Sequence, residues 1–185
     1  ERRLGFVESI FQLPQDSVSF ARDNTITFFN TGETFNYASP AEPVDYSSGV
    51  ICLPSRFKGL PPGKNIEVRG THLANFKEWK KIYSQQETYV KEKEKLSNGS
   101  LNVIEEIIGP FRKNIIYQNT FTPVTIERYT SKKKGAIYGH PTKIKDGDLG
   151  LGSIFLAGTD QGFLGIIGSM LSGVSIANQQ ILPKL

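Results

Sequence analysis

The sequence predicts a mixed α/β fold of the α+β kind, and three observations support that prediction. Short segments rich in β-branched and aromatic residues, a composition typical of strands, fill the first half of the chain. In the middle, apolar residues recur at helical spacing. The last third returns to short apolar segments and closes with a longer one that holds five glycines. With 185 residues, of which 38% are hydrophobic, the chain is long and apolar enough to bury a core.

Four strands are predicted in the first half, separated by turn sequences such as NTGE and GLPPGK. They cover residues 9–13, 25–29, 49–53 and 65–73. The last one alternates between two faces: one carries Ile66, Val68, Gly70 and His72, and the other Glu67, Arg69, Thr71 and Leu73. Because the alternation is imperfect, it suits a sheet that has a helix or a ligand on one side.

The middle of the chain predicts two helices. Aromatic and apolar residues recur at roughly helical spacing from Phe76 to Val90, with Lys and Glu between them, which indicates an amphipathic helix over 75–96. The sequence SNGS is expected to break this helix, and its last residue, Ser100, to N-cap a second helix over 101–108. A Gly-Pro pair is then expected to end the second helix.

The last third predicts strands at 114–118, 122–129 and 153–158, followed by a glycine-rich turn and a final helix over about 166–181. The strand at 153–158 is apolar enough to be buried on both faces of a sheet. The closing apolar segment is too short, and too rich in Gly and Ser, for a convincing membrane span.

Charged and reactive residues narrow the functional classes. The single cysteine, Cys52, excludes an intrachain disulfide and a CxxC metal site, and we expect a buried structural thiol. The two histidines lie far apart without acidic clusters, so neither a metal site nor a catalytic side chain is predicted. The run Lys132–Lys134 suits a solvated loop, an anionic ligand or a lipid surface, but it lacks the interleaved aromatics of a nucleic-acid binder. We therefore expect a cytoplasmic protein without nucleic-acid partners, with peripheral membrane contact as an alternative.

The stretch FLAGTDQGFLGIIGSMLSGVSIAN, residues 155–178, carries the strongest functional signal. Its predicted strand ends at Gly158, Thr159 and Asp160, at the edge where open α/β sheets bind ligands. The glycines that follow would let a ligand approach the backbone, and a helix N-terminus offers N–H groups to a phosphate or carbonyl oxygen. Small residues also recur every four positions along the helix, which fits close structural packing equally well. This stripe consists of Gly165, Ser169, Gly173 and Ala177.

At these residues the chain resembles a known family. The stretch is similar to the C-terminal flavin-binding segment of the phytoene desaturase, carotenoid isomerase and retinol saturase group, within the amine-oxidase-like flavoproteins. Two further stretches, TPVTIERYTSKKKGAIYGH (122–140) and PPGKNIEVRGTH (61–72), resemble the family in the same order, so the likeness covers roughly 50–185. Two departures stand out. The family's N-terminal G-x-G-x-x-G turn is absent, and Thr159 occupies a position where many relatives carry Asp or Glu.

The resemblance implies that the chain is the C-terminal portion of a two-domain FAD-dependent oxidoreductase. Residues 1–129 would belong to a mixed-sheet substrate domain, and 130–185 would supply the terminal strand and helix of a Rossmann-like FAD domain. The N-terminal half of the same protein, with its G-x-G-x-x-G turn, would then be a partner of this chain. The residues expected to bind the cofactor are Gly158, Thr159, Asp160, Gly165, Ile166, Ile167 and Gly168. The residues expected to contact an apolar substrate are Phe28, Phe29, Trp79 and Tyr138.

By the same resemblance, the intact protein is expected to be an oxidoreductase of the desaturase or saturase type that acts on a hydrophobic polyene or a related apolar substrate. FAD would carry the hydride chemistry, while the protein supplies orientation and exclusion of water. This chain alone is expected to be inactive. Two alternatives are a redox-neutral, flavin-dependent carotenoid isomerase and a non-enzymatic fragment that binds a partner or a lipid surface.

Overall fold

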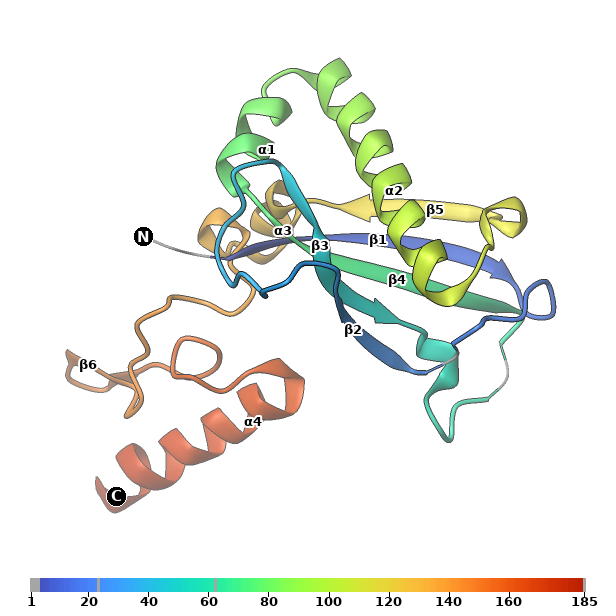
Figure 1. Ribbon diagram of the computed structural model, residues 1–185. Helices are drawn as coiled ribbons and strands as arrows, with labels where there is room; N and C mark the ends of the chain where they lie inside the picture. The colour runs from blue at the N-terminus through green and yellow to red at the C-terminus, as the bar shows by residue number, and fades with distance from the viewer. Residues whose placement is uncertain (1–3, 23, 62, 185) are drawn as a thin grey trace. The chain divides into compact units, whose positions relative to one another are not determined.

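The computed structural model describes residues 4–22, 24–61 and 63–184, and it divides the chain into two compact units (Figure 1). The N-terminal unit runs from Leu4 to Gly135, and the C-terminal unit begins at Ala136. This division lies six residues after the domain boundary expected at 129/130. As expected, the fold is mixed α/β.

The N-terminal unit is built on a five-stranded sheet in the order β2-β3-β4-β1-β5. Its strands are β1 (Gly5–Pro14), β2 (Ile26–Asn30), β3 (Val44–Cys52), β4 (Asn65–Ala74) and β5 (Tyr117–Phe121). The four strands predicted in the first half are confirmed in place, and the one predicted at 114–118 begins three residues later. The expectation of a mixed sheet is wrong, because every described pairing in this sheet is antiparallel.

Alternation along the strands gives the sheet one buried face and one open face. The buried face predicted for β4 is confirmed, since Ile66, Val68, Gly70 and His72 are buried. On the other face Glu67, Arg69 and Thr71 are partly exposed, whereas Leu73 is buried. Figure 1 shows the long helix α2 (Gln86–Ile108) crossing one face of the sheet. The side chains of the buried face therefore pack against α2 and form most of the core.

The helical region differs from its prediction in where it breaks. Helix α1 (Phe76–Tyr83) ends before residue 86, where α2 starts, and α2 then continues without a break through SNGS to Ile108. The predicted helices over 75–96 and 101–108 are therefore wrong at both inner boundaries. Gly99 stays helical because it packs against Tyr46, where an added Cβ would lie 2.6 Å from the ring carbon Cζ. As predicted, Gly109 ends the helix, with φ of 98°.

Ser100 is not a helix cap, because it lies in the middle of α2 and is fully buried. Its hydroxyl lies 2.9 Å from Nε2 of His72, and Nδ1 of His72 lies 3.3 Å from the carbonyl oxygen of Ser48. One imidazole thus links the sheet to the helix. Since both ring nitrogens have partners, His72 satisfies its hydrogen-bonding groups inside the core.

The strand predicted at 122–129 is wrong: Pro123–Thr130 forms helix α3. Thr122 and Thr125 make a reciprocal capping box, and Pro123 occupies the first turn, where its missing N–H has no cost. The hydroxyl of Tyr89, on α2, lies 2.9 Å from Thr122 Oγ1 and ties this cap to the longer helix. Capping therefore overrides the β-branched composition that suggested a strand.

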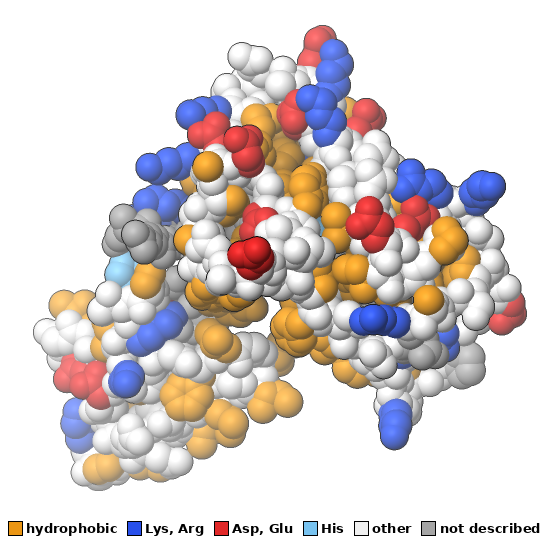
Figure 2. All heavy atoms as spheres, in the orientation of Figure 1, with side chains coloured by type: hydrophobic (Ala, Val, Ile, Leu, Met, Phe, Trp, Pro, Cys, Tyr) orange, Lys and Arg blue, Asp and Glu red, His pale blue; other side chains and the backbone are white. Residues whose placement is uncertain are grey.

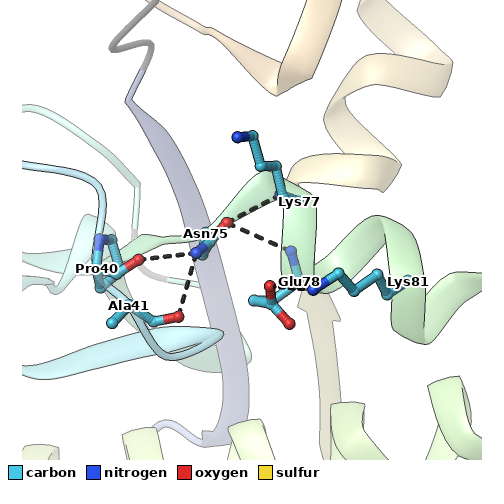
Figure 3. Close-up of polar contacts among 6 residues, drawn as sticks. All are labelled: Pro40, Ala41, Asn75, Lys77, Glu78 and Lys81. Atoms are coloured by element: carbon cyan, nitrogen blue, oxygen red, sulfur yellow. Dashed lines mark hydrogen bonds and ion pairs between the residues drawn. The ribbon is translucent and has the colours of Figure 1, made fainter.

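Asn75 joins β4 to α1 and also anchors the long β2–β3 connection (Figure 3). Its side-chain oxygen accepts hydrogen bonds from the backbone N–H groups of Lys77 at 2.9 Å and Glu78 at 3.3 Å. Its side-chain nitrogen donates to the carbonyl oxygens of Pro40 at 2.8 Å and Ala41 at 3.2 Å. One amide side chain therefore caps a helix and fixes a loop that is distant in sequence.

Two clusters of buried side chains form the core of this unit. The larger one lies between the sheet and the second half of α2, and it contains Phe11, Leu13, Ile51, Leu53, Ile66, Val68, Leu101, Ile104, Ile108 and Phe111. The smaller one joins α1, α3 and the start of α2 to the sheet, and it contains Val7, Val44, Ala74, Trp79, Tyr89, Leu96 and Val124. Short 3₁₀ turns occupy Pro54–Arg56, Arg112–Asn114 and Lys133–Gly135.

The C-terminal unit contains a small hairpin and one helix. Its elements are β6 (Asp148–Leu151), β7 (Ile154–Phe155), α4 (Gly165–Ile176), a π-helical turn over Ala177–Ile181 and a 3₁₀ turn over Leu182–Lys184. The strand predicted at 153–158 is wrong in length and burial, since β7 has two residues and Ile154 is exposed. The helix predicted at 166–181 is confirmed, with a π turn at its end. In the described part of the chain no helix is long and apolar enough to cross a bilayer.

Candidate functional site

The loop from Ala157 to Leu164 leads directly into α4, and glycines set its path. Gly158, Gly162 and Gly165 have φ values of 93°, 121° and 74°, in the left-handed region that side chains other than glycine avoid. A substituted residue at these positions would strain the backbone. The spaced glycines noted in the sequence are therefore required by the loop's conformation, whatever else they do.

Asp160 holds this loop to the segment before it. Its Oδ1 accepts a hydrogen bond from the backbone N–H of His140 at 2.6 Å, and its carbonyl oxygen accepts one from the N–H of Ile144 at 3.1 Å. Gly139 lies so close that an added Cβ would come within 2.3 Å of Oδ1. The carboxylate expected to bind the cofactor thus has a structural role in this unit.

Lys143 brings two of the predicted site residues together. Its Nζ donates to the carbonyl oxygen of Thr159 at 2.9 Å and also to that of Tyr138. Thr159 is half-buried, and the Tyr138 side chain is exposed. Three predicted site residues therefore lie around one loop: Tyr138, Thr159 and Asp160. No local pattern in the sequence predicted that Lys143 would link them.

A second contact, also missed in the sequence, fixes the loop to α4. Ser172 is fully buried, accepts a hydrogen bond from the backbone N–H of Gly158 at 2.6 Å and donates to Oε1 of Gln161. Gln161 is buried as well, and its Nε2 donates to the carbonyl oxygen of Lys145 at 2.9 Å. Because these polar groups satisfy one another, the loop is held in one conformation at the start of the helix.

The N-terminus of α4 is open. Leu164 occupies the N-cap position and makes no side-chain hydrogen bond to the first turn. A Cβ built on Gly165 meets no described atom within 4 Å, whereas Gly168 packs on Phe163. Ile166 is 84% exposed, and Ile167 is also exposed. Four of the predicted cofactor residues, Gly165 to Gly168, thus form a helix end with no side-chain cap and with apolar side chains at its rim.

The two glycines of the small-residue stripe on α4 face no described atom, whereas Ser169 and Ala177 are half-buried. A Cβ built on Gly173 meets no atom within 4 Å, as at Gly165. The buried residues of α4 are instead Ser172 and Ile176. In Figure 2, apolar side chains occupy much of the visible surface of the C-terminal unit. This helix resembles a core helix that its own unit leaves largely uncovered.

The residues predicted to contact substrate from the sheet separate into two groups. Phe28 lies on the open face of β2 and is 79% exposed. Phe29 points to the other face, where its ring meets the His72 ring edge-on at 5.8 Å. Trp79 is 1% exposed and donates its indole N–H to the carbonyl oxygen of Pro43 at 3.0 Å. Trp79 is therefore a core residue, so the structure corrects its assignment to a substrate wall.

Charged and apolar residues mix on the open face of the sheet. Strand register places Phe28, Val50, Thr71, Glu8 and Phe121 in one row across all five strands. Near the middle, Arg69 forms an ion pair with Glu67, and its Nη1 lies 3.6 Å from Glu8 Oε1. The predicted alternation of β4 placed Arg69 and Glu67 on this face, whereas Glu8 was missed because β1 was predicted only from residue 9.

Burial perturbs the titrating groups on this face. It raises the pKa of the Glu8 carboxyl, although the neighbouring Arg69 opposes the shift. It also raises the pKa of the Cys52 thiol, which is half-buried here and not fully buried as expected. For Arg69, burial lowers the pKa, but the hydrogen bond and charge of Glu67 outweigh it, and the net shift is upward. Cys52 therefore stays a protonated, weakly nucleophilic thiol at neutral pH.

No family model matches this chain, and no curated protein sequence matches it. Within residues 4–22, 24–61 and 63–184, no group of three or more His, Cys, Asp or Glu side chains could hold a metal ion.

Proposed function

We propose that this chain supplies the flavin-contacting loop and the substrate domain of an FAD-dependent oxidoreductase that acts on an apolar substrate. One observation supports this most directly. Three glycines with left-handed φ values lead into the N-terminus of α4, which has no side-chain cap and lies next to the exposed Ile166. These are the same residues that resemble a flavin-binding segment. The proposal rests on this coincidence of geometry and resemblance.

The residues around the loop fit a flat, electron-rich ring. The N–H groups in the first turn of α4 can donate to a ring carbonyl oxygen, and the helix dipole favours negative charge at that point. The absence of a side chain at Gly165 lets the ring approach the backbone. Ile166 and Ile167 would cover the ring edge and exclude water. Bound FAD would supply the hydride chemistry.

Several features of the C-terminal unit support a larger FAD domain around it. Helix α4 is apolar nearly all round, and β7 exposes Ile154. Helices of this kind are stable when they are buried in the core of a larger protein. The proposed domain would provide that cover, together with the G-x-G-x-x-G turn that this sequence lacks.

The open face of the five-stranded sheet would form part of the substrate-binding surface. It presents Phe28 and Phe121 at its edges, with the Glu8–Arg69 pair between them. Apolar rings of this kind suit an apolar chain or ring system, and a few polar groups among them could orient it. No described side chain is assigned a proton-transfer role.

The test is flavin occupancy in the longer protein that we expect the gene to encode. We expect the purified long form to carry flavin absorbance in stoichiometric amount, and the 185-residue chain to bind FAD weakly or not at all, because the phosphate-binding half is lacking. In the long form, Ile166→Asp should lower flavin occupancy at least tenfold, which corresponds to a loss on the order of 1.4 kcal/mol of binding free energy, because a carboxylate would occupy the helix N-terminus in place of the flavin. Leu151→Asp, at another exposed apolar position, is the matched control.

The proposal fails if the long form carries no flavin after reconstitution, or if Ile166→Asp and Leu151→Asp have equal occupancy. Stoichiometric flavin on the 185-residue chain alone would contradict the expectation that a second half is needed. Mass analysis of the product then separates the reactions. A change of two hydrogens supports the oxidoreductase, and an unchanged mass supports an isomerase at the same site.

A further inference from the structure

One end of the five-stranded sheet gathers three connections. Strands β1 and β3 end there, while β2, β4 and β5 begin there, as their antiparallel register requires. Hydrogen bonds hold the connections together at this end: Gln15 donates its backbone N–H to the Lys64 carbonyl oxygen at 3.1 Å, and Asn114 Nδ2 donates to the Ser17 carbonyl oxygen at 3.0 Å. We call the surface formed by the described residues of these connections, 15–22, 24–25, 53–61, 63–64 and 109–116, the basic end.

The basic end is strongly positive. Its three connections contain six basic residues against two acidic ones, so their net charge equals the +4 of the whole chain. The β2–β3 connection at the opposite end, residues 31–43, contains two acidic residues and no basic one. An anionic partner would therefore be attracted to the basic end more than to the β2–β3 connection.

The β3–β4 connection, residues 53–64, adds exposed apolar groups to this charge. Phe57 is 47% exposed and Leu60 is 58% exposed, on either side of a turn at Gly59 with φ of 84°. The connection projects from the end of the sheet and is drawn in teal in Figure 1. Both side chains therefore present apolar surface at the tip of this loop that another surface can contact.

The base of the same connection is firmly anchored. Leu53 is buried in the core and donates its backbone N–H to the Thr25 carbonyl oxygen at 2.8 Å. Thr25 Oγ1 in turn donates to the Arg56 carbonyl oxygen at 3.1 Å. The tip with Phe57 and Leu60 is thus presented by a fixed stem, and ordering it on a partner costs less entropy than ordering a free loop would.

We propose that the basic end docks on an anionic lipid surface. Phe57 and Leu60 would enter the headgroup region, and Lys58, Lys64 and Lys113 would bind anionic headgroups around them. Arg112 is already engaged by Glu105, with Nε 2.6 Å from Oε2, so the lysines carry the charge contribution. A lipid surface fits because it accepts a small apolar tip and a ring of cations without a complementary pocket. This proposal is independent of flavin binding.

Flotation of the 185-residue chain with lipid vesicles tests the proposal. We expect partition onto phosphatidylcholine vesicles that contain phosphatidylserine, little partition onto pure phosphatidylcholine, and release by high salt. Reversing the charge of two cations, Lys58→Glu with Lys64→Glu, should weaken partition by about fivefold or more per cation. Phe57→Ser with Leu60→Ser should weaken partition onto these vesicles about tenfold, because each substitution removes an apolar side chain that would enter the headgroup region.

Two control pairs locate the contact. Lys91→Glu with Lys133→Glu makes the same charge change at exposed lysines outside the basic end and should leave partition within about twofold of the unmodified chain. Leu151→Ser with Ile154→Ser removes exposed apolar groups from the β6–β7 hairpin and should do the same. A second readout is Phe57→Trp, whose emission should shift to the blue on anionic vesicles and be quenched by headgroup-level quenchers.

Several results would overturn the proposal. One is equal partition of the chain onto neutral and anionic vesicles. Another is a loss of vesicle binding in either control pair that is as large as the loss in the loop variants. A third is binding to a soluble polyanion without binding to vesicles. The last result would assign the basic end to an acidic macromolecule. Circular dichroism of each variant would confirm that it remains folded, since all the substituted side chains are exposed.

Discussion

The two units of this chain use their apolar residues in opposite ways. In the N-terminal unit, the buried face of the sheet and α2 enclose two clusters of fully buried side chains. In the C-terminal unit, Ala136 and Ile176 are the apolar residues that the described structure buries, while α4 exposes Ile166, Ile167, Met170, Leu171 and Val174. The first unit has the core of an independent domain. The second is held by hydrogen bonds around Asp160 and Ser172.

This difference shows that a regular helix need not mean a completed core. Helix α4 forms because its backbone hydrogen bonds are internal, but its side chains gain little from burial in the described chain. Most helical stability in proteins comes from packing of an apolar face. We therefore expect substitutions of the same kind to have large effects in the first unit and small or opposite effects in the second.

The largest contrast should come from removing apolar side chains. Phe111→Ala should lower the free energy of unfolding of the N-terminal unit by about 3–5 kcal/mol, because the ring is fully buried between Phe11 and Phe20. Ile166→Ala, on α4, should change stability by less than about 0.5 kcal/mol. Urea denaturation followed by far-UV circular dichroism measures both. A large loss for Ile166→Ala would mean that α4 is covered in solution.

A pH-dependent contrast should come from the buried His72. Burial lowers its pKa to about 4, although the hydrogen bond to the Ser48 carbonyl oxygen opposes the shift. In the unfolded chain the imidazole has a pKa of about 6.5. The contribution of His72 to the free energy of unfolding is therefore fully present above that pH, and it falls by about 3 kcal/mol as the pH drops towards 4. His72→Gln should be less stable at neutral pH but should lack this part of the slope. Denaturation midpoints measured from pH 7 to 4 check it, and equal slopes in both proteins would refute it.

Glycine substitutions should reverse sign between the units. In Gly70→Ala the new Cβ would lie 2.5 Å from Ile104 Cδ1 and 2.8 Å from Ser100 Oγ, so we expect a loss of about 1–3 kcal/mol from overpacking. In Gly173→Ala the Cβ meets nothing within 4 Å, so the helix should gain about 0.5–1 kcal/mol. Amide hydrogen exchange reports each unit separately. Weaker protection of α4 in Gly173→Ala would contradict the open surface around it.

The smallest contrast concerns the helix N-termini. Asn75→Ala should cost about 1 kcal/mol, because it removes the cap of α1 and the bonds to Pro40 and Ala41. Leu164→Asn should stabilise α4 by up to about 1 kcal/mol, since it adds a cap where there is none. Thermal unfolding of the two variants checks the opposite signs. If Leu164→Asn also lowers flavin occupancy in the long form, the uncapped turn contributes to binding.

The sequence predicted the sheet well and the helices less well, for identifiable reasons. Alternation in β4 marked its buried face correctly, because a strand that is buried on one side must alternate. The sequence SNGS suggested a break, but α2 continues since Gly99 packs on Tyr46 and Ser100 bonds to His72, both long-range contacts. At 122–129 the β-branched residues suggested a strand, although the Thr122–Thr125 capping pair was visible.

The loop before α4 was predictable in position but not in detail. Glycine spacing predicted a glycine-rich turn before the final helix, and the structure has a loop there, from Ala157 to Leu164. The buried bond between Ser172 and Gln161 and the bridging Lys143 depend on the folded path of the loop, which local pattern does not encode. Phe28 and Phe29 could have been separated in advance, because neighbouring residues in a strand point to opposite faces.

The place of β1 in the sheet also bears on how the chain folds as it is synthesised. It precedes the other strands of this sheet along the chain, yet its two neighbours are β4, at residues 65–74, and β5, at 117–121. Phe11 pairs with Val68 on β4, 57 positions later, and with Gln118 on β5, 107 positions later, and it is fully buried only in the finished core. Such long-range pairing slows folding to about milliseconds to seconds. The ribosome-bound chain thus carries the apolar side chains of β1 uncovered, and a chaperone that shields short apolar segments would act on this strand.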